Sequence, residues 1–106
     1  MISNLEKLIG TPRDGALLRY SLGLEYEKAG RGHDAAAQLR EAVRRDPLYS
    51  AAWKALGRVL TEDSPQEALD ALRQGLEAAR QKGDRQAEKE MTVFARRLEK
   101  KLGGAA

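Results

Sequence analysis

The apolar residues of this chain recur at steps of three and four residues along most of its length. Leu18, Leu22 and Tyr26 keep this spacing near the start, and Leu98 and Leu102 keep it near the end. Because an α-helix turns once every 3.6 residues, such steps place the apolar side chains on one face of a helix. The pattern therefore predicts an all-α protein of about six amphipathic helices.

Polar residues near the N-terminus predict where the first helices begin. Ser3 and Glu6 have the spacing of a capping box and predict a short helix over residues 3–10. The first long helix is capped by either Thr11 or Asp14, a choice that the sequence leaves open. We expect the short helix to cover the open N-terminal end of the helices that follow.

The clearest helix start lies in the second half of the chain. It combines an N-cap, a proline in the first turn and a capping-box glutamate, which are Ser64, Pro65 and Glu67. We expect this helix to run to Lys82, where Gly83 ends it. Asp84 then caps a last amphipathic helix over residues 84–102.

The spacing of residues 16–47 returns about one repeat later in the chain. The offset is 34 residues for the first helix and 33 residues for the second. In the first repeat these positions are Arg19, Leu22, Gly23 and Tyr26, then Ala35, Leu39, Ala42 and Pro47. The corresponding positions of the second repeat are Trp53, Leu56, Gly57 and Leu60, then Ala68, Leu72 and Gly75. Self-similarity at this period is typical of helical repeat arrays.

This pattern resembles the tetratricopeptide repeat, which has an aromatic residue, Leu-Gly and Tyr on one helix and Ala, a bulky apolar residue, Ala and Pro across the next. The resemblance implies a right-handed superhelical array of antiparallel helix-turn-helix repeats, an α-solenoid. It predicts a single domain over residues 1–102, with repeat one at 14–47, repeat two at 48–82, a capping helix at 84–102 and a disordered tail at 103–106. Arg80 stands where the family would place a closing proline.

The resemblance also implies a protein-binding scaffold or adaptor. In such arrays the first helix of each pair lines a concave groove, which holds a peptide or a helix of a partner protein. The residues that match groove positions are Leu17, Tyr20, Leu24, Glu27, Lys54, Arg58, Glu88, Thr92 and Arg96. Lys54 and Arg58 lie one turn apart and suit a carboxylate, so we expect the partner to present an acidic peptide segment.

Several groove residues have a second interpretation. Lys54 and Arg58 also fit an ordinary solvated helix face, and the N-terminal helix is an alternative cover for Leu17 and Leu24. Trp53 matches the packing position of the family, so we expect it in the core.

Two alternative functions stay open. The last helix carries a basic cluster, Arg96, Arg97, Lys100 and Lys101, which fits nucleic-acid binding but also complements the dipole of its own helix. Two repeats are fewer than the three or so that an isolated solenoid needs. A homodimer, or a structural adaptor subunit of a larger assembly, is therefore the other alternative.

Composition and candidate chemistry narrow the function classes further. The 19 Lys and Arg are mixed with 16 Asp and Glu, so the net charge of +3 does not by itself select a nucleic-acid ligand. Cysteine is absent, and no apolar run in the first thirty residues fits a signal peptide or membrane span, so we expect a cytoplasmic protein. His33 is the single histidine and is expected in a turn without a nucleophile beside it. We expect no enzyme activity, no cofactor and no metal.

Overall fold

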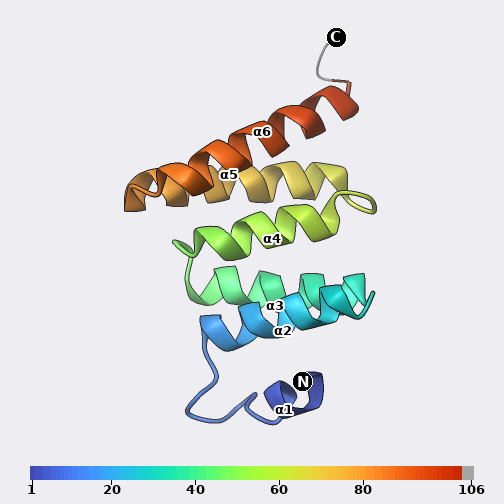
Figure 1. The fold of residues 1–106 in the computed structure, drawn as a ribbon, viewed down its shortest axis with the longest axis vertical. Coiled ribbons are helices and arrows are strands. Elements are labelled where there is room, and N and C mark those ends of the chain that lie inside the picture. The colour runs from blue at the N-terminus through green and yellow to red at the C-terminus, as the bar shows by residue number, and fades with distance from the viewer. Residues whose placement is uncertain (104–106) are drawn as a thin grey trace.

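The computed structural model describes residues 1–103 as a stack of six α-helices that follow one another in chain order (Figure 1). The helices are α1 (Ile2–Glu6), α2 (Ala16–Lys28), α3 (Gly32–Arg45), α4 (Ser50–Leu60), α5 (Pro65–Lys82) and α6 (Arg85–Lys101). No strand occurs among these residues, and the predicted all-α fold is confirmed. Most of the tail that was expected to be disordered, residues 104–106, lies outside the described part of the chain.

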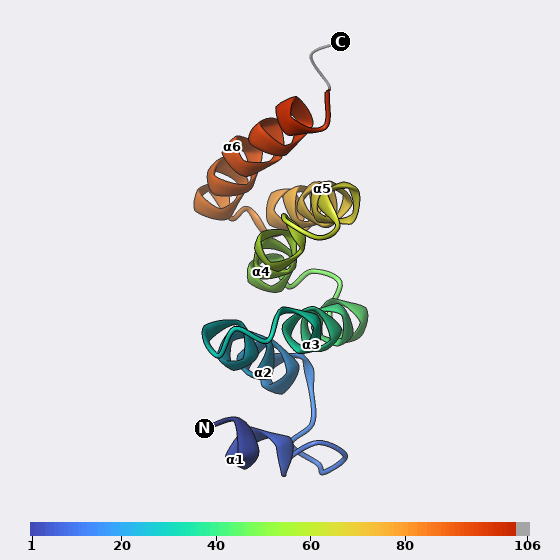
Figure 2. The ribbon, with the colours of Figure 1, turned by 90° about the vertical axis from the view of Figure 1, so that its right-hand side faces the viewer.

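The helices pack as two antiparallel pairs with one helix at each end. α2 packs against α3, α4 packs against α5, and α6 packs on α5. Figure 2 shows α2, α4 and α6 on one side of the stack and α3 and α5 on the other. Within residues 1–103, no helix is both long and apolar enough to cross a bilayer.

The repeated Leu-Gly pattern explains why each pair packs so closely. A Cβ added to Gly23 would lie 2.6 Å from the Cγ of Leu39, and one added to Gly57 would lie 2.7 Å from the Cγ of Leu72. Glycine therefore leaves room for a leucine of the partner helix. This contact outweighs the roughly 1 kcal/mol that glycine costs relative to alanine within a helix.

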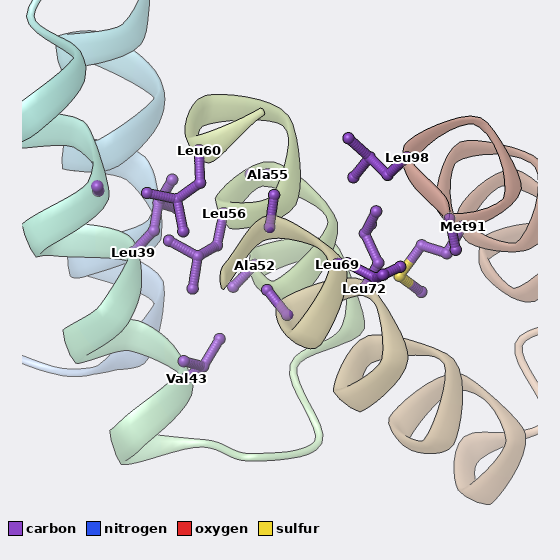
Figure 3. Packing of buried hydrophobic residues seen from close by; sticks show 14 of the residues in the cluster. Leu39, Val43, Ala52, Ala55, Leu56, Leu60, Leu69, Leu72, Met91 and Leu98 are labelled. Atoms are coloured by element: carbon purple, nitrogen blue, oxygen red, sulfur yellow. The ribbon is translucent and has the colours of Figure 1, made fainter. Parts of the chain in front are cut away.

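A continuous apolar core runs from α3 to α6 (Figure 3). Leu39, Leu72, Met91 and Leu98 are its largest fully buried members. Trp53 packs against this core but is only partly buried, and its indole Nε1 donates to the carbonyl of Pro47 at 2.8 Å. The main core thus joins both helix pairs and the last helix into one unit.

A smaller cluster lies at the N-terminal end, where α1 covers α2. The buried residues are Leu18, Leu22, Tyr26 and Ala35, and Ile2, Leu5 and Leu8 pack against them. The hydroxyl of Tyr26 donates to the carboxylate of Glu6, which ties α1 to α2. The N-terminal helix therefore covers the end of the array, as its apolar residues predicted.

The predicted boundaries at this end are wrong in two respects. α1 begins at Ile2 and ends at Glu6 instead of spanning 3–10, and Ser3 lies inside it without a capping role. The N-cap of α2 is Gly15, so neither Thr11 nor Asp14 caps it. Asp14 instead accepts two bonds from Arg19, each of 2.9 Å. A two-point bond to a guanidinium is stronger than a single capping bond to a backbone N–H, and it takes the carboxylate away from the helix start.

The same competition occurs at the start of α5. Ser64 holds the N-cap position, but its side chain makes no capping bond. Glu67 reaches instead across to α3, where Arg40 donates to it at 2.8 and 2.9 Å. The predicted end of α5 and the predicted start of α6 are confirmed, because Gly83 is left-handed with φ 70° and Asp84 accepts from the N–H of Ala87 at 3.0 Å.

Candidate functional site

The side of the stack formed by α2, α4 and α6, here called the α2–α4–α6 face, carries most of the predicted groove residues. Two tyrosines lie together where α2 meets the start of α4. The rings of Tyr20, on α2, and Tyr49, just before α4, have centroids 4.9 Å apart and planes tilted by 45°. Both tyrosines and Leu24 are partly buried and pack against the main core. Neither hydroxyl bonds another group within residues 1–103, so both are available to a ligand.

A bidentate ion pair joins α2 to α4 beside these tyrosines. The guanidinium of Arg58 donates to both oxygens of Glu27, at 2.7 and 2.8 Å. These bonds raise the pKa of Arg58 above its already high ordinary value. Two parallel bonds fix the orientation of both side chains, so this pair also fixes how α2 lies against α4.

A second ion pair joins α4 to α6. Nζ of Lys54 lies 2.8 Å from Oε1 of Glu90, and Gln86 donates to the other oxygen of this carboxylate at 3.2 Å. The bond from Lys54, followed by the one from Gln86, lowers the pKa of Glu90. Both cations that were expected to hold a partner's carboxylate therefore already hold a carboxylate of this chain. A ligand carboxylate would have to replace Glu27 or Glu90.

Leu17 lies apart from the other residues predicted for the groove. Its side chain is 68% exposed, so α1 does not cover it. With Leu5 and Leu8 it lines a cleft of about 280 Å³ between α1 and α2. Leu24 is not covered by α1 either, because it packs against the main core.

The predicted residues of α6 are not brought beside Lys54. Glu88 accepts from Arg80 of α5 at 3.0 Å, and Thr92 donates to the backbone carbonyl of Glu88 at 2.7 Å. Arg96 follows on the same flank at the next turn and is exposed. The residue of α6 that does reach Lys54 is Glu90, which follows Glu88 by two positions.

The long α5 explains this shift. In repeat one the second helix ends at Arg45, shortly before Pro47, whereas α5 continues to Lys82 because Arg80 replaces the closing proline. The 34-residue offset that relates residues of α2 to residues of α4 therefore does not relate α4 to α6. The missing proline was the signal in the sequence for this change, whereas nothing in the repeat pattern pointed to Tyr49.

His33 lies among charged residues at the start of α3. His33 is exposed in the first turn of α3, one residue inside the helix, where a turn was expected. Asp34, beside it, accepts from Nε of Arg31 at 2.8 Å. Within residues 1–103, no three His, Cys, Asp or Glu side chains gather in a way that could hold a metal ion.

Known proteins share both this sequence pattern and this arrangement of helices. A family model described as tetratricopeptide repeat matches residues 16–59. A TPR repeat-containing protein of Pseudomonas aeruginosa is 46% identical over 101 residues, which cover 94% of this chain and 96% of that protein. This similarity therefore extends over nearly the full length of both chains.

Two solved structures have the same arrangement. The solution structure of a protein from Bordetella parapertussis is 38% identical with a TM-score of 0.78, and the match covers 95% of this chain and 89% of that one. The crystal structure of a tetratricopeptide repeat domain protein from Salinibacter ruber is 29% identical with a TM-score of 0.76, covering 81% and 97% of the two chains.

Proposed function

Because the chain belongs to the tetratricopeptide repeat family, we propose that it is a non-catalytic module that binds a segment of a partner protein across the α2–α4–α6 face. Proteins of this family generally mediate protein–protein interactions, and helical arrays of this kind bind their partners on extended surfaces. The observation that carries the proposal is the pair Tyr20 and Tyr49, which is held against the core with both hydroxyls available.

The tyrosine pair has the chemistry of an interface anchor. Tyrosine is enriched among the residues that dominate binding energies, because a rigid ring supplies apolar area and its hydroxyl a hydrogen bond. The core holds the two rings in place before a ligand arrives, so little side-chain entropy is lost on binding. The pairs Glu27–Arg58 and Lys54–Glu90 then form a charged but neutralised rim.

This rim changes the expected ligand. An acidic peptide segment should bind this face less favourably than the sequence predicted, because Lys54 and Arg58 are each paired within the chain. A segment that offers apolar side chains and backbone carbonyls to the tyrosines fits the face better. A carboxylate of the partner would bind here only by exchange with Glu27 or Glu90.

The test compares two variants in which an ion pair is reversed but kept. Glu27→Arg with Arg58→Glu reverses the pair on the proposed face, whereas Arg40→Glu with Glu67→Arg reverses the bidentate pair between α3 and α5 on the other side. Each variant is immobilised, exposed to nuclease-treated lysate of the source organism, and compared with the wild type by mass spectrometry. A far-ultraviolet circular dichroism spectrum checks that both remain folded.

We expect a partner that binds the wild type and the Arg40/Glu67 variant and is lost from the Glu27/Arg58 variant. Retention by all three proteins would contradict the proposed face. If capture requires that nuclease be omitted, the ligand is a nucleic acid and the proposed class of partner is wrong. Light scattering on the purified wild type tests the alternative of a homodimeric adaptor.

A further inference from the structure

The net charge of the protein is concentrated on its last helix. The 17 residues of α6 include six Lys or Arg and three Glu, which leaves thirteen basic and thirteen acidic residues in the rest of the chain. The net charge of +3 therefore belongs entirely to α6.

The three acidic residues of α6 are all turned toward the rest of the stack. Glu88 pairs with Arg80 at 3.0 Å, Glu90 with Lys54 at 2.8 Å, and Glu99 with Arg73 at 3.1 Å. The cations in these pairs come from α4 and α5. Each carboxylate of α6 is thus neutralised by an inner helix and leaves the outer basic side chains without a local counter-charge.

The opposite side of α6, here called the α6 basic face, consists of Lys89, Val93, Arg96, Arg97 and Lys100. All five side chains are exposed, and none of the four cations forms an ion pair within residues 1–103. Val93 is 50% exposed and lies in the middle of this face, opposite the buried Met91, Ala95 and Leu98. From Lys89 to Lys100 the face is about 16 Å long.

Nothing in the described chain packs on this face, because α6 is the last helix of the stack (Figure 1). The residues recur at steps of three and four, which is also the spacing of a ridge on a partner helix. A helix laid along α6 would therefore continue the stack. Its own side chains would meet the cations at matching intervals.

We propose that the α6 basic face docks an acidic helix of a partner protein, with an apolar side chain of that helix packed on Val93. The inference rests on the proposed function only in taking the ligand to be a protein. It assigns the acidic partner to this face, whose cations form no ion pair with the described residues, and not to Lys54 and Arg58, which are each paired.

The composition of the face favours a protein over a nucleic acid. Protein interfaces combine an apolar centre with a polar rim and are enriched in arginine, as Val93 between Arg96 and Arg97 would provide. Proteins that bind single-stranded nucleic acids stack bases on aromatic side chains. Phe94, the aromatic residue of α6, packs against the main core instead.

Two triple variants with the same change of charge test the proposal. Lys89→Glu, Arg96→Glu and Lys100→Glu alter the basic face. Lys7→Glu, Arg13→Glu and Lys82→Glu alter three other exposed cations that form no ion pair in the described chain. The probe is a fluorescein-labelled synthetic amphipathic helix of Glu, Ala and Leu, titrated at two salt concentrations and followed by fluorescence anisotropy.

We expect the basic-face variant to bind this peptide at least about tenfold more weakly than the control variant, because it loses the local complementarity and not only the overall charge. Val93→Ser is expected to weaken binding about threefold, the effect of losing part of one apolar contact. Amide chemical shifts of the labelled wild type should move in α6 and not around Tyr20. Equal loss in both triple variants, or shifts centred on α2 and α4, would overturn the proposal.

A duplex DNA oligonucleotide serves as competitor in the same titration. If it binds more tightly than the peptide and loses affinity in the basic-face variant, the face is a nucleic-acid site and the proposal is wrong. The lysate capture described above separates the two proposals. A partner lost only from the Glu27/Arg58 variant supports the α2–α4–α6 face alone, whereas one lost only from the basic-face variant supports the α6 site alone.

Discussion

Lys54 bonds Glu90 at 2.8 Å, although the residue one 34-residue repeat after Lys54 is Glu88. This shift of two positions means that a side of α6 other than the one that the repeat offset indicates faces α4. It brings Glu90 to α4 and leaves Glu88 beside Arg80 of α5. Lys89, Arg96 and Lys100 are exposed on the outer side of α6. The neutral rim of the α2–α4–α6 face and the basic face of α6 thus both follow from the way in which α6 packs on the stack.

Gly23→Ala is expected to destabilise the protein even though alanine is the better helix former. The added Cβ would lie 2.6 Å from the Cγ of the fully buried Leu39, and overpacking of this kind typically costs 1–3 kcal/mol. After the gain of about 1 kcal/mol in helix propensity, a net loss of up to about 2 kcal/mol remains. Urea denaturation measures it.

Gly32→Ala is the matched control for this substitution. Gly32 is the first residue of α3, and a Cβ built on it meets no atom within 4 Å. We expect this variant to be as stable as the wild type or more stable by up to about 1 kcal/mol. Similar unfolding midpoints for the two variants would show that Leu39 moves aside without cost.

Glu27 and Arg58 should show a favourable coupling in a double-mutant cycle. The pair is bidentate but partly exposed, with 30% and 44% of the two side chains accessible, so we expect about 0.5–1 kcal/mol at low salt. The variants are Glu27→Gln, Arg58→Met and the double substitution, compared by urea denaturation. Because exposed charges are screened, the coupling should fall when NaCl is raised to about 1 M. A salt-independent value would point to packing of the arginine stem instead.

Asp14 should make the stability depend on pH in the acidic range. The bonds from Arg19 and from the N–H of Gly10 hold the pKa of Asp14 well below its ordinary value of 3.8. The unfolded chain therefore takes up the proton first as the pH falls, and the stabilisation present above about pH 4 is lost at lower pH. Glu41, whose pKa Arg44 and Arg45 lower to about 2, contributes in the same direction.

The measurement for Asp14 is the free energy of unfolding of wild type and Asp14→Asn from pH 7 to pH 2. The wild type should be the more stable protein near neutrality, and the two curves should converge as the pH falls through the range below 4. Parallel curves would mean that the charge of Asp14 is not what holds the connection between α1 and α2.

Tyr26→Phe should loosen α1 without unfolding the stack. The substitution removes the hydroxyl that donates to Glu6 and keeps the ring, over which the guanidinium of Arg31 lies at 4.6 Å. Hydrogen exchange should therefore become faster for the amides of α1, such as Leu5, and stay unchanged around Leu72 in the main core. Tyr20→Phe is the control, because the hydroxyl of Tyr20 bonds no group within residues 1–103. Equal acceleration in both variants would contradict the role of the Glu6 bond.

The helical architecture could be predicted from the amino-acid sequence, because the signals involved are local or strictly periodic. The steps of three and four residues predicted the helices, and the Leu-Gly pattern at Gly23 and Gly57 predicted two close helix pairs. Gly83 and Asp84 predicted the boundary between α5 and α6, since a left-handed glycine and a capping carboxylate act within one turn of the helix. These features need no knowledge of distant contacts.

Which charged residues are available to a partner depends on contacts between residues that are far apart in the sequence. Arg19 has the position in repeat one that Trp53 has in repeat two, yet it pairs with Asp14 while Trp53 packs beside Gly75. Glu67 bonds Arg40 of α3 instead of capping α5, and Asp14 bonds the side chain of Arg19 instead of the backbone at the start of α2. An ion pair depends on which side chains meet in space, and the side of α6 that faces the stack depends on where α5 ends. That is why the repeat pattern located the helices but not the surface cations that form no ion pair within residues 1–103.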